Sequence, residues 1–223
     1  MGLLNNEQRV VACNVVCGTT LIHRSEKGKN MTAMTRLLCT SVILFLATGT
    51  VARATNYNEG INGDLSGNRL IPTDLVLTPG TNSVIATSVR NDREYLHITV
   101  PGGFVLSALI NASYTGNDGT AFVGVQAGST FTEDPATVNV ANLLGWSHFG
   151  TNLATVGEDI LDDIGLGDDA IGFTPPLPAG DYTFWIQQTG TNACTYQFDF
   201  MVTPEPASLG LLLIGLSALR RRK

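Results

Sequence analysis

Positive charge is nearly absent from the long central stretch of this 223-residue chain. Residues 55–203 contain no lysine and only three arginines, against 16 carboxylates, so the stretch has a net charge of −13. A surface of that charge repels phosphate backbones and anionic membranes, because binding would take up counterions instead of releasing them. We therefore expect no nucleic-acid partner.

Cysteine is scarce as well, and the motifs of common hydrolases are missing. Three of the four cysteines precede residue 55, and Cys194 is alone in the central stretch, so no disulfide can form within it. The chain contains no G-x-S-x-G or H-E-x-x-H motif, and the stretch offers only His97 and His148 as histidine bases. We therefore predict a protein that is not an enzyme and that needs no cofactor.

Residues 31–54 have the three parts of a secretory signal peptide. Arg36 supplies a positive charge, Leu37 to Ala47 form an apolar run, and Ala52 and Ala54 are small residues at the positions that a signal peptidase requires. We expect a signal helix here, with cleavage after Ala54 by signal peptidase as a processing partner.

A secretory signal belongs at the start of a chain, which raises the question of residues 1–30. The simplest explanation is that translation begins at Met31 or Met34. We therefore expect residues 1–30 to be an upstream extension that the native protein lacks.

The last 20 residues, 204–223, contain a break, an apolar segment and a cationic end. The break is Pro204-Glu205-Pro206, whose prolines prevent a following helix from continuing backwards. The segment from Ala207 to Leu219 has a length of about 20 Å as a helix, shorter than the roughly 30 Å hydrocarbon core of a bilayer. We expect this apolar helix to be the only part that contacts a membrane, with the final basic residues held on the cytoplasmic side: Arg220, Arg221, Arg222 and Lys223.

This tail resembles the PEP-CTERM sorting signal of Gram-negative bacteria, which combines a Pro-Glu-Pro motif, one apolar segment and a terminal arginine cluster. The resemblance covers the last 20 residues. It implies recognition by an exosortase, a membrane cysteine transpeptidase that would cut close to Pro204-Glu205-Pro206. It also implies a producer that makes extracellular polysaccharide and forms biofilm or floc.

Short runs in which apolar and polar residues alternate dominate residues 55–203. In the run from Tyr95 to Val100 the even positions are apolar and the odd positions polar, and this period of two is typical of half-buried strands. Seven strands are predicted in this way: 75–77, 84–87, 95–100, 104–114, 120–126, 181–186 and 196–202. Their spacing predicts an all-β fold, an antiparallel β-sandwich or jelly roll, flanked by the signal helix and the apolar C-terminal helix.

Two local patterns add detail to this fold. Asn117-Asp118-Gly119 lies between two predicted strands, which favours a hairpin formed by 104–114 and 120–126. Ile160, Leu161 and Ile164 have the spacing of one helix face and predict a short helix that caps the sandwich. We expect His148 to lie in a loop.

The central stretch also resembles the bacterial pre-peptidase C-terminal domain over most of residues 60–202. The residues that carry this resemblance are Gly63-Asp64-Leu65-Ser66, Glu94 to Pro101, and Leu177 to Phe184. The resemblance implies a secreted β-sandwich module without catalytic activity.

Two groups of residues are candidates for ligand binding. Six carboxylates crowd into residues 158–169; we favour a solvated acidic surface, and the alternative is a calcium site formed by Asp159, Asp162, Asp163, Asp168 and Asp169. Trp185 falls on the opposite strand face from Phe184, so we expect it to be exposed and able to stack on a sugar. Further aromatic candidates, with core packing as the alternative, are Tyr114, Trp146 and Tyr182.

These patterns predict an exported, non-catalytic structural or interaction protein of the cell envelope or extracellular polysaccharide matrix of a Gram-negative bacterium. The tail would anchor it transiently in the inner membrane before an exosortase processes it. A carbohydrate-binding module protein is the alternative, and a secreted hydrolase is the second alternative.

Overall fold

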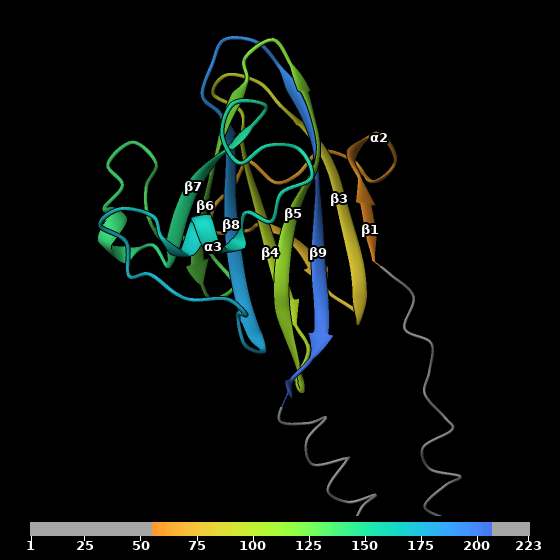
Figure 1. Cartoon of the computed structure of the whole chain (residues 1–223). Helices are drawn as coiled ribbons and strands as arrows, with labels where there is room; N and C mark the ends of the chain where they lie inside the picture. The colour runs from red at the N-terminus through yellow and green to blue at the C-terminus, as the bar shows by residue number, and fades with distance from the viewer. Residues whose placement is uncertain (1–54, 207–223) are drawn as a thin grey trace, which may run out of the picture. The chain divides into compact units, whose positions relative to one another are not determined.

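The computed structural model describes residues 55–206 (Figure 1). The upstream extension, the signal helix and the apolar C-terminal helix predicted from the sequence lie outside these residues. The described part is all-β and contains two sheets, as predicted. Its strands are β1 (Asn56–Asn58), β2 (Thr73–Val76), β3 (Gly80–Ser88), β4 (Arg93–Val100), β5 (Phe104–Gly116), β6 (Thr120–Ala127), β7 (Gly145–Gly150), β8 (Gly180–Gln188) and β9 (Cys194–Pro204). Its short helices are α2 (Glu59–Asn62), the 3-10 helix η1 (Val140–Asn142) and α3 (Leu161–Gly165).

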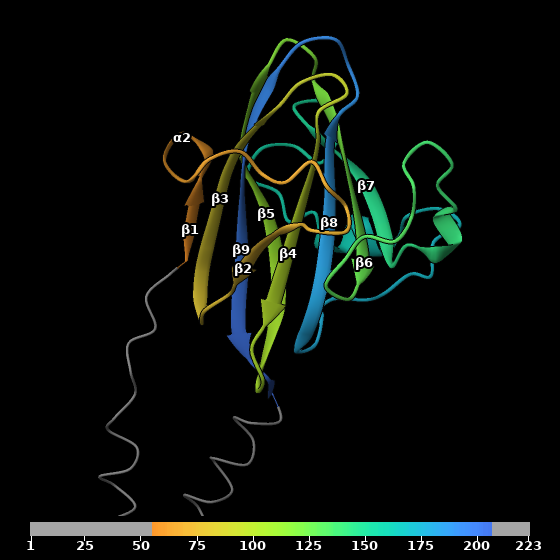
Figure 2. The same ribbon diagram turned by 180° about the vertical axis from the view of Figure 1, so that it is seen from behind.

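Sheet one has the strand order β1-β3-β9-β5, and sheet two has the order β2-β4-β8-β6-β7. Most neighbours are antiparallel, but the short strands β1 and β2 run parallel to β3 and β4. Sheet two, with β2, β4 and β8, faces the viewer in Figure 2. The last strand, β9, pairs on both sides, so the C-terminal end of the fold is a central strand and not an edge strand.

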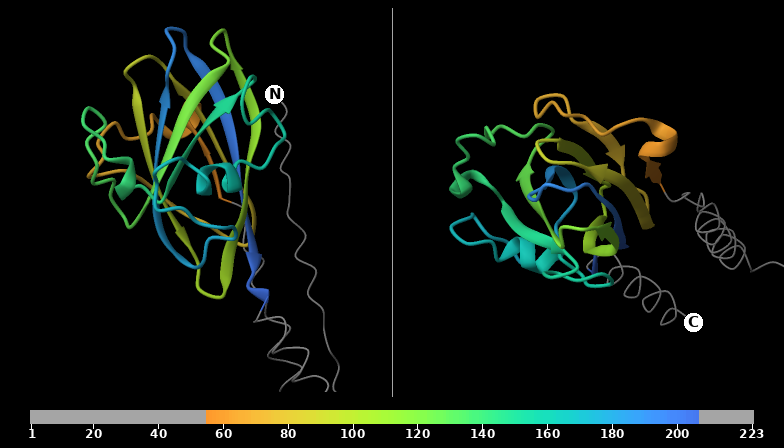
Figure 3. Two further views of the ribbon diagram at one scale, coloured as in Figure 1. Left: turned by 60° about the vertical axis from the view of Figure 1, so that its left-hand side comes forward. Right: turned by 90° about the horizontal axis from the view of Figure 1, so that it is seen from above.

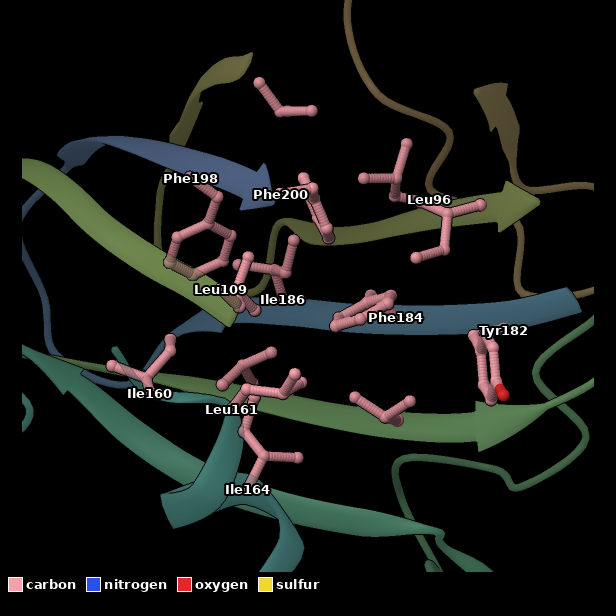
Figure 4. Close-up of a cluster of buried hydrophobic side chains, with 14 of the residues drawn as sticks. Leu96, Leu109, Ile160, Leu161, Ile164, Tyr182, Phe184, Ile186, Phe198 and Phe200 are labelled. Atoms are coloured by element: carbon pink, nitrogen blue, oxygen red, sulfur yellow. The ribbon is translucent and has the colours of Figure 1, made fainter. Parts of the chain in front are cut away.

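The alternating residues form the interior between the two sheets, which confirms the period-two interpretation. Leu96 and Phe184 of sheet two meet Phe200 of sheet one in the close-up of Figure 4, and all three are fully buried. The rings of Phe184 and Phe200 lie 5.4 Å apart, edge to face at 88°. This arrangement adds a favourable electrostatic contact to the apolar burial.

The predicted hairpin between residues 104–114 and 120–126 is wrong. These segments are β5 and β6, and β5 pairs with β9 in sheet one whereas β6 pairs with β7 and β8 in sheet two. The Asn117-Asp118-Gly119 turn, which is exposed or half-buried, therefore carries the chain from sheet one to sheet two. Asp118 fixes this crossing, because its carboxylate accepts hydrogen bonds from the backbone and side-chain nitrogens of Asn192 at 2.6 and 3.1 Å.

A second apolar cluster covers the outer face of sheet two, where the alternation predicts polar residues. Tyr95 and Trp185 point away from the main interior, but residues 128–143 fold over them and bring Phe131 and Leu143 into contact. This segment is the green loop that projects from the sandwich in Figures 2 and 3. Tyr95 is only 1% exposed, so the expectation of a polar outer face is wrong at this position.

The predicted short helix is present as α3, and it packs one face against the interior while Asp162 and Asp163 are exposed. Ile160, Leu161 and Ile164 are fully buried (Figure 4), and the backbone N–H of Ile160 donates a 2.8 Å hydrogen bond to the carbonyl oxygen of Leu109 in β5. Asp159 fixes this position, because one carboxylate oxygen accepts the backbone N–H groups of Leu109 and Leu161 at 2.9 and 3.0 Å.

Candidate functional site

A cleft opens beside β7, the edge strand of sheet two, and is the candidate functional site. Its volume is about 320 Å³, at the lower end of the range for small-molecule sites. Strand β7 forms one wall, and the loop and helix that follow it form the other. The lining residues are Trp146, Ser147, His148, Leu153, Ala154, Asp163, Leu166, Gly167 and Asp168.

The aromatic wall of the cleft is made of rings that fix one another. Trp146 and His148 are two residues apart on β7, so they share a face of the strand, and their ring centroids lie 5.7 Å apart. Phe122, on the same face of the neighbouring strand β6, contacts both rings: it stacks with Trp146 at 6.2 Å and 26°, and it meets His148 edge to face at 5.9 Å. Trp146 is half-buried, as are Phe122 and His148.

Two glycines allow the opposite wall to approach β7 closely. A Cβ at Gly145 would overlap the carbonyl oxygen of Ile164 in α3, and a Cβ at Gly167 would lie 2.5 Å from the carbonyl oxygen of Trp146. The indole Nε1–H of Trp146 donates a 2.9 Å hydrogen bond to the carbonyl oxygen of Asp168. The two walls are therefore joined, and the indole is held in one orientation.

Polar side chains of the cleft are free to bind a ligand. Within residues 55–206, neither ring nitrogen of His148 has a hydrogen-bond partner, and the carboxylates of Asp163 and Asp168 have none either. Burial raises the pKa of Asp163, and the negative charges of Asp162, Glu158 and Asp159 raise it further.

His148 lies in β7 and not in the loop that the sequence predicted. The strand was missed because its residues Gly-Trp-Ser-His-Phe-Gly do not alternate: Trp146 and His148 share the outer face, while Phe149 alone is buried in the main core. The spacing of two residues between Trp146 and His148 was the sequence feature that could have indicated a strand with both rings on one face.

The expectation of an exposed Trp185 is wrong. Its side chain does lie on the opposite face from Phe184, but it is only 7% exposed and is enclosed by Phe122 and Phe131 at 4.6 and 5.7 Å. A sugar could reach this ring only if residues 128–143 moved away. Tyr114 and Tyr182 are also buried, so Trp146 is the one accessible aromatic among the four sequence candidates.

The five aspartates proposed as calcium ligands do not converge. Asp159 points toward β5 and α3, and Asp162 accepts the backbone N–H of Asp163. Only Asp163 and Asp168 line the cleft, and Asp169 does not. No three His, Cys, Asp or Glu side chains within residues 55–206 form a group that could hold a metal ion.

The other histidine, His97, lies between two carboxylates on the outer face of sheet two. Its Nδ1 is 2.6 Å from Asp74 and its Nε2 is 3.2 Å from Asp181, and Thr99 donates a hydrogen bond to the same Asp181 oxygen. A nucleophilic hydroxyl needs a free histidine nitrogen within hydrogen-bond distance. Both nitrogens of His97 face carboxylates, so the arrangement does not match that of a serine hydrolase.

Glu94 is a buried carboxyl group whose position sequence reasoning did not single out. It lies on the apolar face of β4 with no exposed surface, and the hydroxyl of Tyr196 donates a hydrogen bond to its Oε2. Its Oε1 has no hydrogen-bond partner within residues 55–206. Its pKa is raised to about 8, mainly by burial. The hydrogen bond from Tyr196 lowers this pKa, and the nearby negative charges raise it further: Glu59, Asp92 and Asp64.

Cys194 is buried, with 1% of its surface exposed, and burial raises the pKa of its thiol. It is the free cysteine of the described residues. A thiol that is inaccessible and protonated does not act as a nucleophile.

The Pro204-Glu205-Pro206 motif begins where β9 ends. Pro204 pairs with Phe104 as the last residue of the strand, and the backbone N–H of Glu205 donates a 3.0 Å hydrogen bond to Gly103. Both prolines are exposed. The other processing positions, Ala52, Ala54, Arg220, Arg221, Arg222 and Lys223, lie outside the described residues.

Within residues 55–206, no helix has the length and apolar character needed to cross a bilayer. No protein-family model matches the chain, and no similar sequence is found among curated proteins. The two resemblances noted in the sequence therefore remain predictions.

Proposed function

We propose that this chain is an exported, non-catalytic structural or interaction protein of the cell envelope or extracellular polysaccharide matrix of a Gram-negative bacterium. A signal peptide would direct its export, and an exosortase would process its C-terminal tail. The observation that supports this proposal most directly is the position of Pro204-Glu205-Pro206, which only Thr203 separates from the last core residue of the fold, Val202.

This position is suited to removal of the tail. Val202 is 2% exposed and pairs with both neighbouring strands, whereas the three residues of the motif are exposed or half-buried. A cut within or after the motif would remove no buried side chain of residues 55–203. The processed domain would keep its whole interior, as a protein released to an extracellular matrix must.

The experiment that tests this proposal is the intact mass of the native protein recovered from the cell surface and from spent medium. We expect a species that begins at Thr55 and ends between residues 203 and 206. A double substitution, Pro204→Ala with Pro206→Ala, should leave the tail uncut while the signal peptide is still removed. A wild-type species that retains Leu209 to Lys223 would contradict the sorting function.

Carbohydrate binding is the second candidate function, and the cleft beside β7 is the observation that favours it. The cleft has one accessible indole and several free hydrogen-bonding groups. Such a domain would attach to the polysaccharide itself, in addition to being delivered to it.

A further inference from the structure

The aromatic wall of the β7 cleft offers a rigid, half-buried indole. Trp146 is supported by Phe122 and tied to Asp168 through its Nε1–H, so its ring is held in place before any ligand arrives. Ligand binding then loses little side-chain entropy. Tryptophan combines a large apolar surface with a polar edge, which suits ligands that have both apolar and hydroxyl-bearing faces.

The hydrogen-bonding groups of the cleft are mainly acceptors placed around this indole. Asp163 comes from α3, Asp168 from the loop after it, and His148 from β7, so three separate elements contribute one group each. None of these side chains makes a hydrogen bond within residues 55–206. A ligand with several hydroxyl donors would satisfy them together.

The charge of the cleft selects against anions. Asp163 and Asp168 are two of its nine lining residues, and no lysine or arginine is among the nine. Residues 55–203, these two aspartates included, have a net charge of −13. A phosphate, a sulfate or a uronic acid carboxylate would be repelled at this surface.

We propose that the β7 cleft binds a neutral saccharide, with one sugar ring stacked on Trp146 and its hydroxyl groups donating hydrogen bonds to Asp163 and Asp168. The proposal deepens the carbohydrate-binding function and rests on it. His148 supplies a further hydrogen bond from β7. The volume of the cleft accommodates about one or two sugar rings, so the site holds a chain end or a short segment of polymer.

The chain contains only two tryptophans, which provide an internal control for a binding experiment. Trp146 lines the cleft, and Trp185 is enclosed beneath residues 128–143. In an NMR titration of the ¹⁵N-labelled native protein, each indole N–H gives its own signal, and a Trp146→Phe variant assigns them. The probes are neutral hexasaccharides of glucose, mannose, galactose or xylose, with a hexasaccharide of galacturonic acid as the anionic comparison.

We expect at least one neutral hexasaccharide to shift the Trp146 signal in a saturable manner, while the Trp185 signal stays unchanged. The galacturonic acid hexasaccharide should shift neither. If no neutral probe shifts the Trp146 signal, or if the anionic probe shifts it equally, the proposal is wrong.

Two neighbouring aspartates give a matched pair of variants that keeps the test independent of folding. Asp168→Asn removes a charged acceptor that lines the cleft and should weaken binding about tenfold. Asp169→Asn removes the adjacent exposed carboxylate, which does not line the cleft, and should leave the affinity unchanged. Equal effects of the two variants would overturn the assignment. The outcome is separate from the sorting function, because the intact-mass experiment detects tail removal whether or not a sugar binds.

Discussion

Replacing Glu94 with glutamine should remove a large part of the pH dependence of this protein's stability. Glu94 has no exposed surface, and its Oε1 has no hydrogen-bond partner within residues 55–206. Its pKa is about 8 in the folded protein, against 4.5 for an ordinary glutamate, mainly because burial disfavours the charged form. Between these two pH values the folded protein holds a proton at Glu94 that the unfolded chain has released.

The sign and size of the effect follow from proton linkage. A group whose pKa is raised on folding contributes stability that is fully present below its unfolded pKa and is lost as the pH rises through its folded pKa. The free energy of unfolding should therefore fall by ~1.4 kcal/mol per pH unit between the two pKa values. From pH 5 to pH 7 the loss is about 3 kcal/mol, or about 6–12 °C in melting temperature for a domain of this size.

The assay is urea unfolding of the native protein at pH values from 5 to 8. Glu94→Gln mimics the protonated acid, so we expect it to match the wild type within about 1 kcal/mol at pH 5 and to exceed it by several kcal/mol at pH 8. Asp169→Asn is the control for the loss of one carboxylate, because Asp169 is exposed and asparagine tolerates its positive φ of 59°. Stability curves of the wild type and Glu94→Gln that run parallel across this range would refute the reasoning.

Three further predictions concern α3, β7 and the end of β9. Gly145→Ala should destabilise the fold by about 1–3 kcal/mol in urea unfolding, because its Cβ would overlap a carbonyl oxygen of α3; wild-type stability would show that the cleft walls are not in close contact. Leu161→Ala should destabilise the fold by about 2–5 kcal/mol, and Leu166→Ala, at a 76% exposed position, by less than about 0.5 kcal/mol. Similar costs would mean that the apolar face of α3 is not packed against the interior. A chain that ends at Pro206 should unfold at the same urea concentration as one that has the tail. A chain that ends at Phe200 loses the buried side chain of Val202, so its free energy of unfolding should be lower by about 3 kcal/mol or more. Equal stability of the two shortened chains would show that the end of β9 does not contribute to the core.

Much of the fold was predictable because apolar and polar residues alternate in the predicted strands, and this alternation shows which side chains share a face. Alternation places Leu96 and Ile98 on one side of β4 and Phe198 and Phe200 on one side of β9, and all four are buried between the sheets. The spacing of the buried residues of α3 was equally readable. Local periodicity reports which residues share a face, and it does so without knowledge of the partner strand.

The hairpin and the exposure of Trp185 failed because both depend on distant segments. A tight turn after β5 is compatible with pairing to β6 or with a crossing to the other sheet, and the crossing results from the pairing of β5 with β9 and of β6 with β8, two strands far along the chain. Likewise, alternation places Trp185 on the outer face of β8, but it does not reveal that residues 128–143 cover that face. The cleft was hidden for the same reason, since its walls come from β7 and from residues 153–168.

Glu94 shows a different limit of sequence reasoning. Its position two residues before Leu96 on the apolar face of β4 was readable, and this pattern alone indicates a carboxyl group inside the sandwich. What the pattern could not supply was the surroundings: the Tyr196 hydroxyl from the opposite sheet, and the charges of Glu59 and Asp92 close by. Because no positive group faces Glu94 among the groups that shift its pKa, the protein retains the proton and thereby avoids a buried charge. The pH sensitivity of this domain's stability thus comes mainly from the burial of Glu94, and the acidic side chains around it add to the effect.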